Sequence, residues 1–176
     1  MTIRADFIFE GRDLQQVPYH YRECGLDNIW LLNGFSREEY EGEEYISVHD
    51  VDGLWKAIGL SLVVNQKTLS PKEVYFLRRH MKLTQSDLAM RLRVDDQTVA
   101  RWEKGKVKLP GPADLALRAA FLGSEICQPE GRQILVHWEE TVRKLISRDQ
   151  TACVDYIFEK DNEIWAESQL DTRLRA

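Results

Sequence analysis

The chain has few cysteines and no long apolar run. The three cysteines among its 176 residues, Cys24, Cys127 and Cys153, lie far apart and form no Cys-x-x-Cys pair. An odd number of scattered cysteines excludes a disulfide framework and is typical of a reducing cytoplasm. The longest apolar stretch, near residues 58–64, is far shorter than the roughly 20 residues of a membrane span. Because no basic segment with a following apolar stretch opens the chain, we expect a cytoplasmic protein without a membrane segment.

The sequence also lacks the motifs of common enzyme classes. It contains no Gly-rich phosphate loop, no Gly-x-Ser-x-Gly and no His-Glu-x-x-His. Its histidines, His20, His49, His80 and His137, are scattered along the chain. An enzyme would need a pocket of converging titratable groups, and the pattern indicates none. We expect no enzymatic activity, no cofactor and no bound metal.

Charge is distributed unevenly along the chain. The net charge is −5, but residues 1–69 carry −6, residues 70–110 carry +5 and residues 111–176 carry −4. A basic segment matters more for binding a polyanion than the total charge does. The middle of the chain is therefore the candidate contact with nucleic acid.

The elements on either side of this segment predict an α+β fold. Short apolar runs at 5–10 and 28–32 favour strands, and the acidic tract at 36–45 favours a solvated loop or an edge hairpin. Residues 50–58 and 129–147 follow a helical period. The last elements read as a hairpin, formed by residues 152–158 and 163–167 with Asp161 and Asn162 at the turn.

The expected fold is a small acidic N-terminal α+β domain, a helical domain, and a C-terminal helix with a β-hairpin. The predicted boundaries are 1–66, 67–123 and 124–176.

The middle segment contains three helix-start signals. Residues 70–73, Ser-Pro-Lys-Glu, form a capping box with proline at the first helical position. Thr84 and Asp95 are the second and third N-caps, and Gly105 ends the third helix. Three short helices joined by tight turns are the layout of a helix-turn-helix domain. On this pattern alone, a solvated helical bundle remains the alternative.

The residues of this segment carry a family resemblance. KLTQSDLA at 82–89, Val94 and TVARWEKG at 98–105 resemble the Xre/Cro/cI-type helix-turn-helix, over roughly residues 71–121. The resemblance implies that the helix after Asp95 enters the major groove of DNA. The implied DNA-binding residues are Thr84, Gln85, Asp96, Gln97, Thr98, Arg101, Lys104, Lys106 and Lys108.

The roles of these residues follow from the resemblance and from base chemistry. Gln85 is expected to contact a phosphate and to brace the recognition helix. An amide pairs with adenine, arginine pairs with guanine, and a carboxylate such as Asp96 accepts from cytosine or repels wrong sites. The resemblance also implies a buried Arg78–Glu103 pair that holds two helices together and reads no base. Trp102 is expected in the core rather than as a stacking platform.

A narrower resemblance covers the N-terminal half. YHYRECGLDNIWL at 19–31, Leu54 and the helix entry at 68–73 resemble MqsA-like antitoxins and related zinc-finger/helix-turn-helix regulators. That family holds a structural zinc with two Cys-x-x-Cys pairs, and neither pair is present. We expect a metal-free relative in which apolar side chains replace the metal. These are Phe7, Phe9, Tyr19, Tyr21, Trp30 and Leu31.

Two functions are compatible with these patterns. The first is a transcriptional repressor of its own or a neighbouring operon, bound as a homodimer to an inverted repeat of double-stranded DNA. The second is an antitoxin of a type II pair, which binds a small basic toxin protein and represses its own operon. The candidate dimer elements are the helix at 129–147, the hairpin at 152–167 and the fourth helix of the middle domain. Trp138 and Trp165 are placed either at that interface or in the core.

Overall fold

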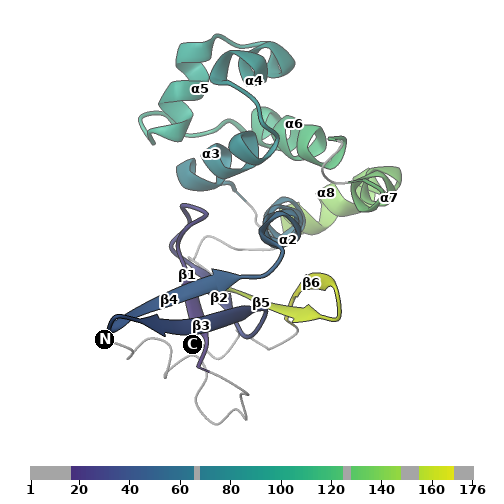
Figure 1. Cartoon of the computed structure of the whole chain (residues 1–176). Helices are drawn as coiled ribbons and strands as arrows, with labels where there is room; N and C mark the ends of the chain where they lie inside the picture. Colours follow the sequence, from purple (N-terminus) through teal and green to yellow (C-terminus); the bar gives the residue numbers. More distant parts are fainter. Residues whose placement is uncertain (1–16, 66–67, 125–127, 148–154, 169–176) are drawn as a thin grey trace. The chain divides into compact units, whose positions relative to one another are not determined.

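The computed structural model describes residues 17–65, 68–124, 128–147 and 155–168 of the chain (Figure 1). The expected strand at 5–10, with Phe7 and Phe9, lies outside these ranges. The chain forms two compact units: a sheet unit, Met1–Ala57 with Cys153–Ala176, and a helical unit, Ile58–Ala152. This division differs from the boundaries expected at 66/67 and 123/124. The last strands belong to the N-terminal sheet, whereas the helices that precede them belong to the helical unit.

The four-stranded sheet joins both ends of the chain. Its strands are β1 (Tyr19–Tyr21), β2 (Ile29–Leu31), β5 (Tyr156–Asp161) and β6 (Ile164–Glu167), in the order β1-β2-β5-β6. β2 and β5 pair in parallel, with Ile29 opposite Tyr156, and the outer pairs are antiparallel. All three residues of β2 are buried, as is usual for a strand that has neighbours on both edges. The expected apolar packing is confirmed for Tyr21, Trp30 and Leu31, which are buried, whereas Tyr19 is half-buried.

The C-terminal hairpin is confirmed, with its turn at Asn162 and Glu163, one residue later than expected. Asn162 has φ 53°, a left-handed conformation that asparagine tolerates. The pairing of this hairpin with β2 was not predicted. It depends on residues more than a hundred positions apart, which no local pattern reveals.

The acidic tract forms an edge hairpin, the second of the two predicted alternatives. β3 (Phe35–Tyr40) and β4 (Glu43–Val48) make a separate two-stranded sheet. Glu41 and Gly42 link them with φ values of 54° and 82°, which is the left-handed pair that a type I′ turn requires.

Helix α2 (Val51–Asn65) is longer than the helix expected at 50–58, and the division between the units falls within it. A Cβ at Gly59 would lie 2.2 Å from the Phe121 ring, so glycine allows α2 to approach α6 closely. Arg118 of α6 is fully buried, and its Nη1 donates to the carbonyl oxygens of Leu62 and Val63, at 2.9 Å each. These bonds satisfy carbonyls that the end of α2 leaves unpaired.

The helical unit begins with three helices that start where the caps predict. α3 (Pro71–His80), α4 (Gln85–Leu92) and α5 (Asp96–Glu103) follow Ser70, Thr84 and Asp95, and α6 (Gly111–Leu122) completes the group. Side chains from all four helices form a common core. The fully buried ones include Leu77, Leu88, Val99, Leu117 and Phe121.

The single helix expected at 129–147 is wrong. The chain forms α7 (Glu130–Val136) and α8 (Trp138–Ser147), separated at His137, which has φ −107° and ψ 32°. No proline or glycine marks the break, so the sequence carries no local signal for it. Trp138 is half-buried, and Trp165 is in the core of the sheet unit. The strands lie in one unit, and all the helices except the first part of α2 lie in the other, so the fold is α+β, as expected. No helix in the described ranges is long and apolar enough to cross a membrane.

Candidate nucleic-acid interface

The start of α5 is fixed by its own cap. The Oδ1 atom of Asp95 accepts from the backbone N–H of Thr98 at 2.6 Å, and the Thr98 hydroxyl donates to Asp95 Oδ2 at 2.8 Å. These bonds hold the pKa of Asp95 below its usual value of 3.8. The Thr98 hydroxyl therefore already donates its hydrogen bond within the protein. The exposed polar side chains of this helix are Asp96, Gln97 and Arg101.

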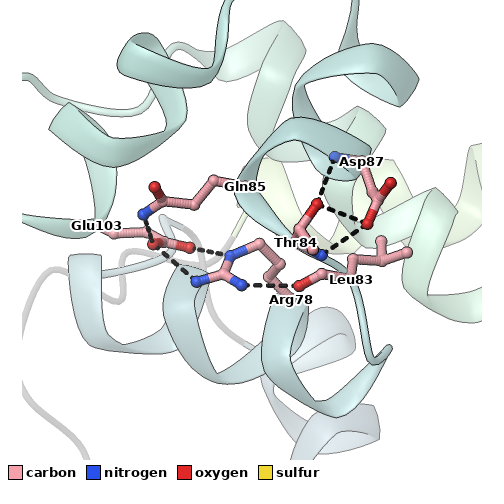
Figure 2. A network of polar contacts seen from close by, with 6 residues as sticks. All are labelled: Arg78, Leu83, Thr84, Gln85, Asp87 and Glu103. Carbon is pink, nitrogen blue, oxygen red and sulfur yellow. Dashed lines mark hydrogen bonds and ion pairs between the residues drawn. The ribbon is translucent and has the colours of Figure 1, made fainter.

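A buried polar network joins three helices (Figure 2). Arg78 of α3 donates to Glu103 of α5 twice, from Nε at 2.5 Å and from Nη2 at 3.0 Å. Its Nη1 donates to the carbonyl of Leu83, at 2.7 Å. The Gln85 amide of α4 donates to Glu103 Oε2, at 2.7 Å. The side chains of Arg78 and Glu103 are 6% and 5% exposed, so the pair is shielded from water.

This network confirms two expectations. The Arg78–Glu103 pair is internal and holds the end of α5 against α3. Gln85 braces α5, while its phosphate contact stays a prediction. A bidentate pair with little exposure fixes geometry better than a surface pair does. Trp102 is 3% exposed, which confirms its place in the core.

Helix α4 starts with a reciprocal cap, also drawn in Figure 2. The backbone N–H of Asp87 donates to Thr84 Oγ1 at 3.0 Å, and the backbone N–H of Thr84 donates to Asp87 Oδ2 at 2.8 Å. These bonds hold the pKa of Asp87 below its usual value of 3.8. Thr84 is exposed at the helix N-terminus, where backbone N–H groups favour an anion.

The lysines after α5 lie on a turn and on the loop that follows it. Gly105 has φ +67°, and the N–H of Lys106 bonds to the Arg101 carbonyl at 2.9 Å. Lys104, Lys106 and Lys108 are exposed, and none of them makes an ion pair within the described residues. Their charges are therefore free to contact phosphates.

The structure brings all nine predicted residues into one unit, on α4, α5 and the turn that follows. Arg93 was not among the predicted DNA-binding residues. It is exposed, with φ 56°, in the turn between α4 and α5. Its basic character in the segment of positive charge was the available signal. Within the described residues, no group of three or more His, Cys, Asp or Glu side chains is arranged to hold a metal ion.

Comparison with known protein families supports a helix-turn-helix in the middle of the chain. Residues 74–127 match the family model described as helix-turn-helix, which is less than a third of the 176 residues. Neither the curated proteins nor the solved structures gave a match. The match supports a DNA-binding transcription regulator of the Xre-type helix-turn-helix class, a class that is typically not enzymatic. It does not reach residues 19–73, which carry the resemblance to MqsA-like antitoxins, so that resemblance remains a prediction.

Proposed function

We propose that the chain is a sequence-specific, autoregulating repressor that binds an inverted repeat of double-stranded DNA as a homodimer. One observation carries the proposal. The buried contacts among Arg78, Glu103 and Gln85 hold α5 in place while its N-terminal half presents exposed polar side chains. A rigid helix with a polar, exposed first turn is what the major groove accepts.

The exposed side chains have distinct tasks in this proposal. Arg101 pairs with a guanine and Gln97 with an adenine, each contributing about 1–3 kcal/mol of discrimination. Asp96 accepts from a cytosine amino group or disfavours other bases. Thr98 supports the helix start, since its hydroxyl is bonded to Asp95. The exposed lysines after α5 and the N-terminus of α4, with Thr84 and Gln85, contact phosphates and set the register.

Dimerisation follows from the small size of the module. One helix-turn-helix buries too little surface for high specificity, and a two-fold dimer reads two half-sites. Helix α8 is a candidate dimer element, because its half-buried Trp138 and Val142 are apolar. Its exposed Glu139–Arg143 and Glu140–Lys144 pairs would then form the rim.

A mobility-shift titration on the DNA upstream of its own gene tests the proposal, with a random duplex at the same salt as the control. Arg101→Ala should weaken specific binding by about 1–3 kcal/mol and relax base choice. Lys106→Ala should weaken binding to all sequences alike and lower the salt slope by about 1. Equal losses on both duplexes for both variants would overturn the assignment of α5 as the recognition helix.

The antitoxin function remains a prediction from the acidic N-terminal region and the narrower resemblance. It requires a stoichiometric complex with a small basic protein encoded nearby. A pull-down with such a protein tells it apart from the regulator alone.

A further inference from the structure

The β3–β4 hairpin presents one face that no other described element covers. Strand register places Glu38 opposite Tyr45 and Tyr40 opposite Glu43, and paired residues share a face. Tyr40 and Tyr45 are 65% and 51% exposed, which is high for large aromatic side chains, and both glutamates are exposed. We call these four side chains the tyrosine face.

The opposite face of the hairpin is anchored at its base. Phe35 is buried, and its ring lies 5.5 Å from the ring of Tyr19. Arg37 pairs with Glu44 at 2.8 Å and also donates to the carbonyl of Val17. Among the described residues, the hairpin is therefore held from one side only. The tyrosine face is thus exposed within the described residues although the other face of the hairpin is anchored.

The chemistry of the tyrosine face suits cations. Tyrosine rings attract guanidinium and ammonium groups, and neighbouring carboxylates pair with them. Between residues 36 and 45 the chain carries five glutamates and one arginine. Tyrosine is also among the side chains that are enriched at the positions dominating the binding energy of an interface.

The same chain carries a surface of matching chemistry. We call Arg101, Lys104, Lys106 and Lys108 the basic face; all are exposed. They lie in the segment 70–110, where the net charge is +5. Every copy of the chain thus supplies one acidic aromatic surface and one basic surface, in equal amounts. Such complementarity favours association and steers the encounter.

We propose that the tyrosine face of one copy binds the basic face of a second copy. The inference rests on the proposed function, because the basic face is also the proposed contact with DNA. The hairpin and DNA then compete for the same cations. If the contact is reciprocal, two copies close a two-fold dimer in which both basic faces are covered. The contact between copies would then reduce binding to non-specific DNA. A specific site, which offers stronger contacts, would displace the tyrosine face from the basic face.

Self-association of the full chain at low and at high salt tests the contact. The wild type should show an association in sedimentation that high salt removes, because exposed charges are screened. The double variant Tyr40→Ser/Tyr45→Ser keeps the net charge and should weaken this association about tenfold or more. The triple variant Lys104→Ala/Lys106→Ala/Lys108→Ala should weaken it similarly. A 1:1 mixture of the two variants should associate again, since each supplies the face that the other lacks.

Competition with DNA distinguishes a direct contact between the tyrosine face and the basic face from a general effect of the protein's net charge. In the double tyrosine variant, binding to a random duplex at high protein concentration should be several-fold tighter than in the wild type. A control that removes charge elsewhere, Asp161→Asn/Glu163→Gln, should leave self-association unchanged.

Other outcomes overturn the inference. Unchanged self-association in the double tyrosine variant would do so, as would a mixture that stays dissociated. A wild type without a salt-dependent association, while an arginine-rich peptide binds the hairpin, would mean that the occupant is a foreign basic protein. In each of these cases the mobility shift on specific DNA is measured independently. A failure of the proposed function can therefore be distinguished from a failure of this inference.

Discussion

The helices α3 to α5 and the four-stranded sheet are stabilised by contacts of very different range. At the start of α4, Thr84 bonds to Asp87, three residues away. In the sheet unit, Asn33 exchanges two hydrogen bonds with the backbone of Lys160, 127 residues away. Short-range contacts form as soon as the local chain is ordered, whereas long-range contacts first require closure of a long loop. Hydrogen bonds between residues close in sequence thus fix the starts of the helices, whereas the sheet depends on contacts between distant parts of the chain.

One feature of the helical region does not follow this rule, and it gives the largest expected effect. Arg78→Ala would leave the Glu103 carboxylate, which is 5% exposed, without its guanidinium partner. A buried charge that loses its ionic partner costs about 3–5 kcal/mol of unfolding free energy, and the Gln85 amide is neutral and does not replace that partner. Denaturant unfolding measures the loss.

Arg37→Ala is the matched control for this prediction, because it removes a pair whose side chains are 33% and 57% exposed. It should cost less than about 1 kcal/mol. Replacing both partners, Arg78→Met with Glu103→Leu, should recover most of the stability. Similar small losses for Arg78→Ala and Arg37→Ala would mean that the buried network does not hold α5.

The sheet gives the next largest effect, at Gly34. This residue has φ +73°, and a Cβ there would lie 2.4 Å from the Trp165 ring. Gly34→Ala should therefore cost roughly 1–3 kcal/mol for overpacking, in addition to backbone strain. Hydrogen exchange should increase in β5 and β6, while the amides of α3 to α5 keep their protection.

Gly42→Ala separates the two causes, because Gly42 has φ +82° with nothing within 4 Å of the added Cβ. It should show the strain of a left-handed backbone alone, about 1 kcal/mol. If both alanine variants lose the same stability, the contact with Trp165 contributes nothing.

The difference in range also explains what the sequence could predict. The caps Ser70, Thr84 and Asp95 are read from residues three apart, and all three helices start where these caps place them. The Arg78–Glu103 pair was predicted only because a family resemblance supplied it. The parallel pairing of β2 with β5 and the break at His137 have no local signature, and neither was predicted. For the candidate site, the residue types could be predicted from the sequence. The hydrogen bond from the Thr98 hydroxyl to Asp95 could be found only in the structure.

A single cap gives a smaller effect and tests the local rule directly. Thr84→Ala removes the oxygen that accepts the Asp87 N–H. The expected cost is about 1 kcal/mol of unfolding free energy. Ser86→Ala, an exposed position of the same helix, should be near neutral and serves as the control. A neutral Thr84→Ala would show that tertiary packing alone specifies the start of α4.

The smallest expected effect is a pH dependence with opposite signs at two caps. Asp95 is fully exposed, and its bonds to Thr98 lower its pKa from 3.8. Below pH 3.8 the unfolded chain gains this proton first, so the contribution of Asp95 is complete above 3.8 and is lost as the pH falls through its lowered pKa. Glu73 behaves oppositely, because burial raises its pKa from 4.5. The folded chain gains that proton first, and stability increases as the pH falls through the raised pKa towards 4.5.

Thermal unfolding between pH 3 and 6 distinguishes the two groups. Asp95→Asn should flatten the loss of stability below pH 3.8, and Glu73→Gln should remove the gain above pH 4.5. Both groups are carboxylates that accept a backbone N–H at a helix start, from Ser70 for Glu73 and from Thr98 for Asp95, so burial is the main difference between them. If both variants change the profile in the same direction, burial of Glu73 does not outweigh its hydrogen bonds to Ser70. The local hydrogen bonds would then set the direction of the Glu73 pKa shift, as they do at Asp87 and Asp95.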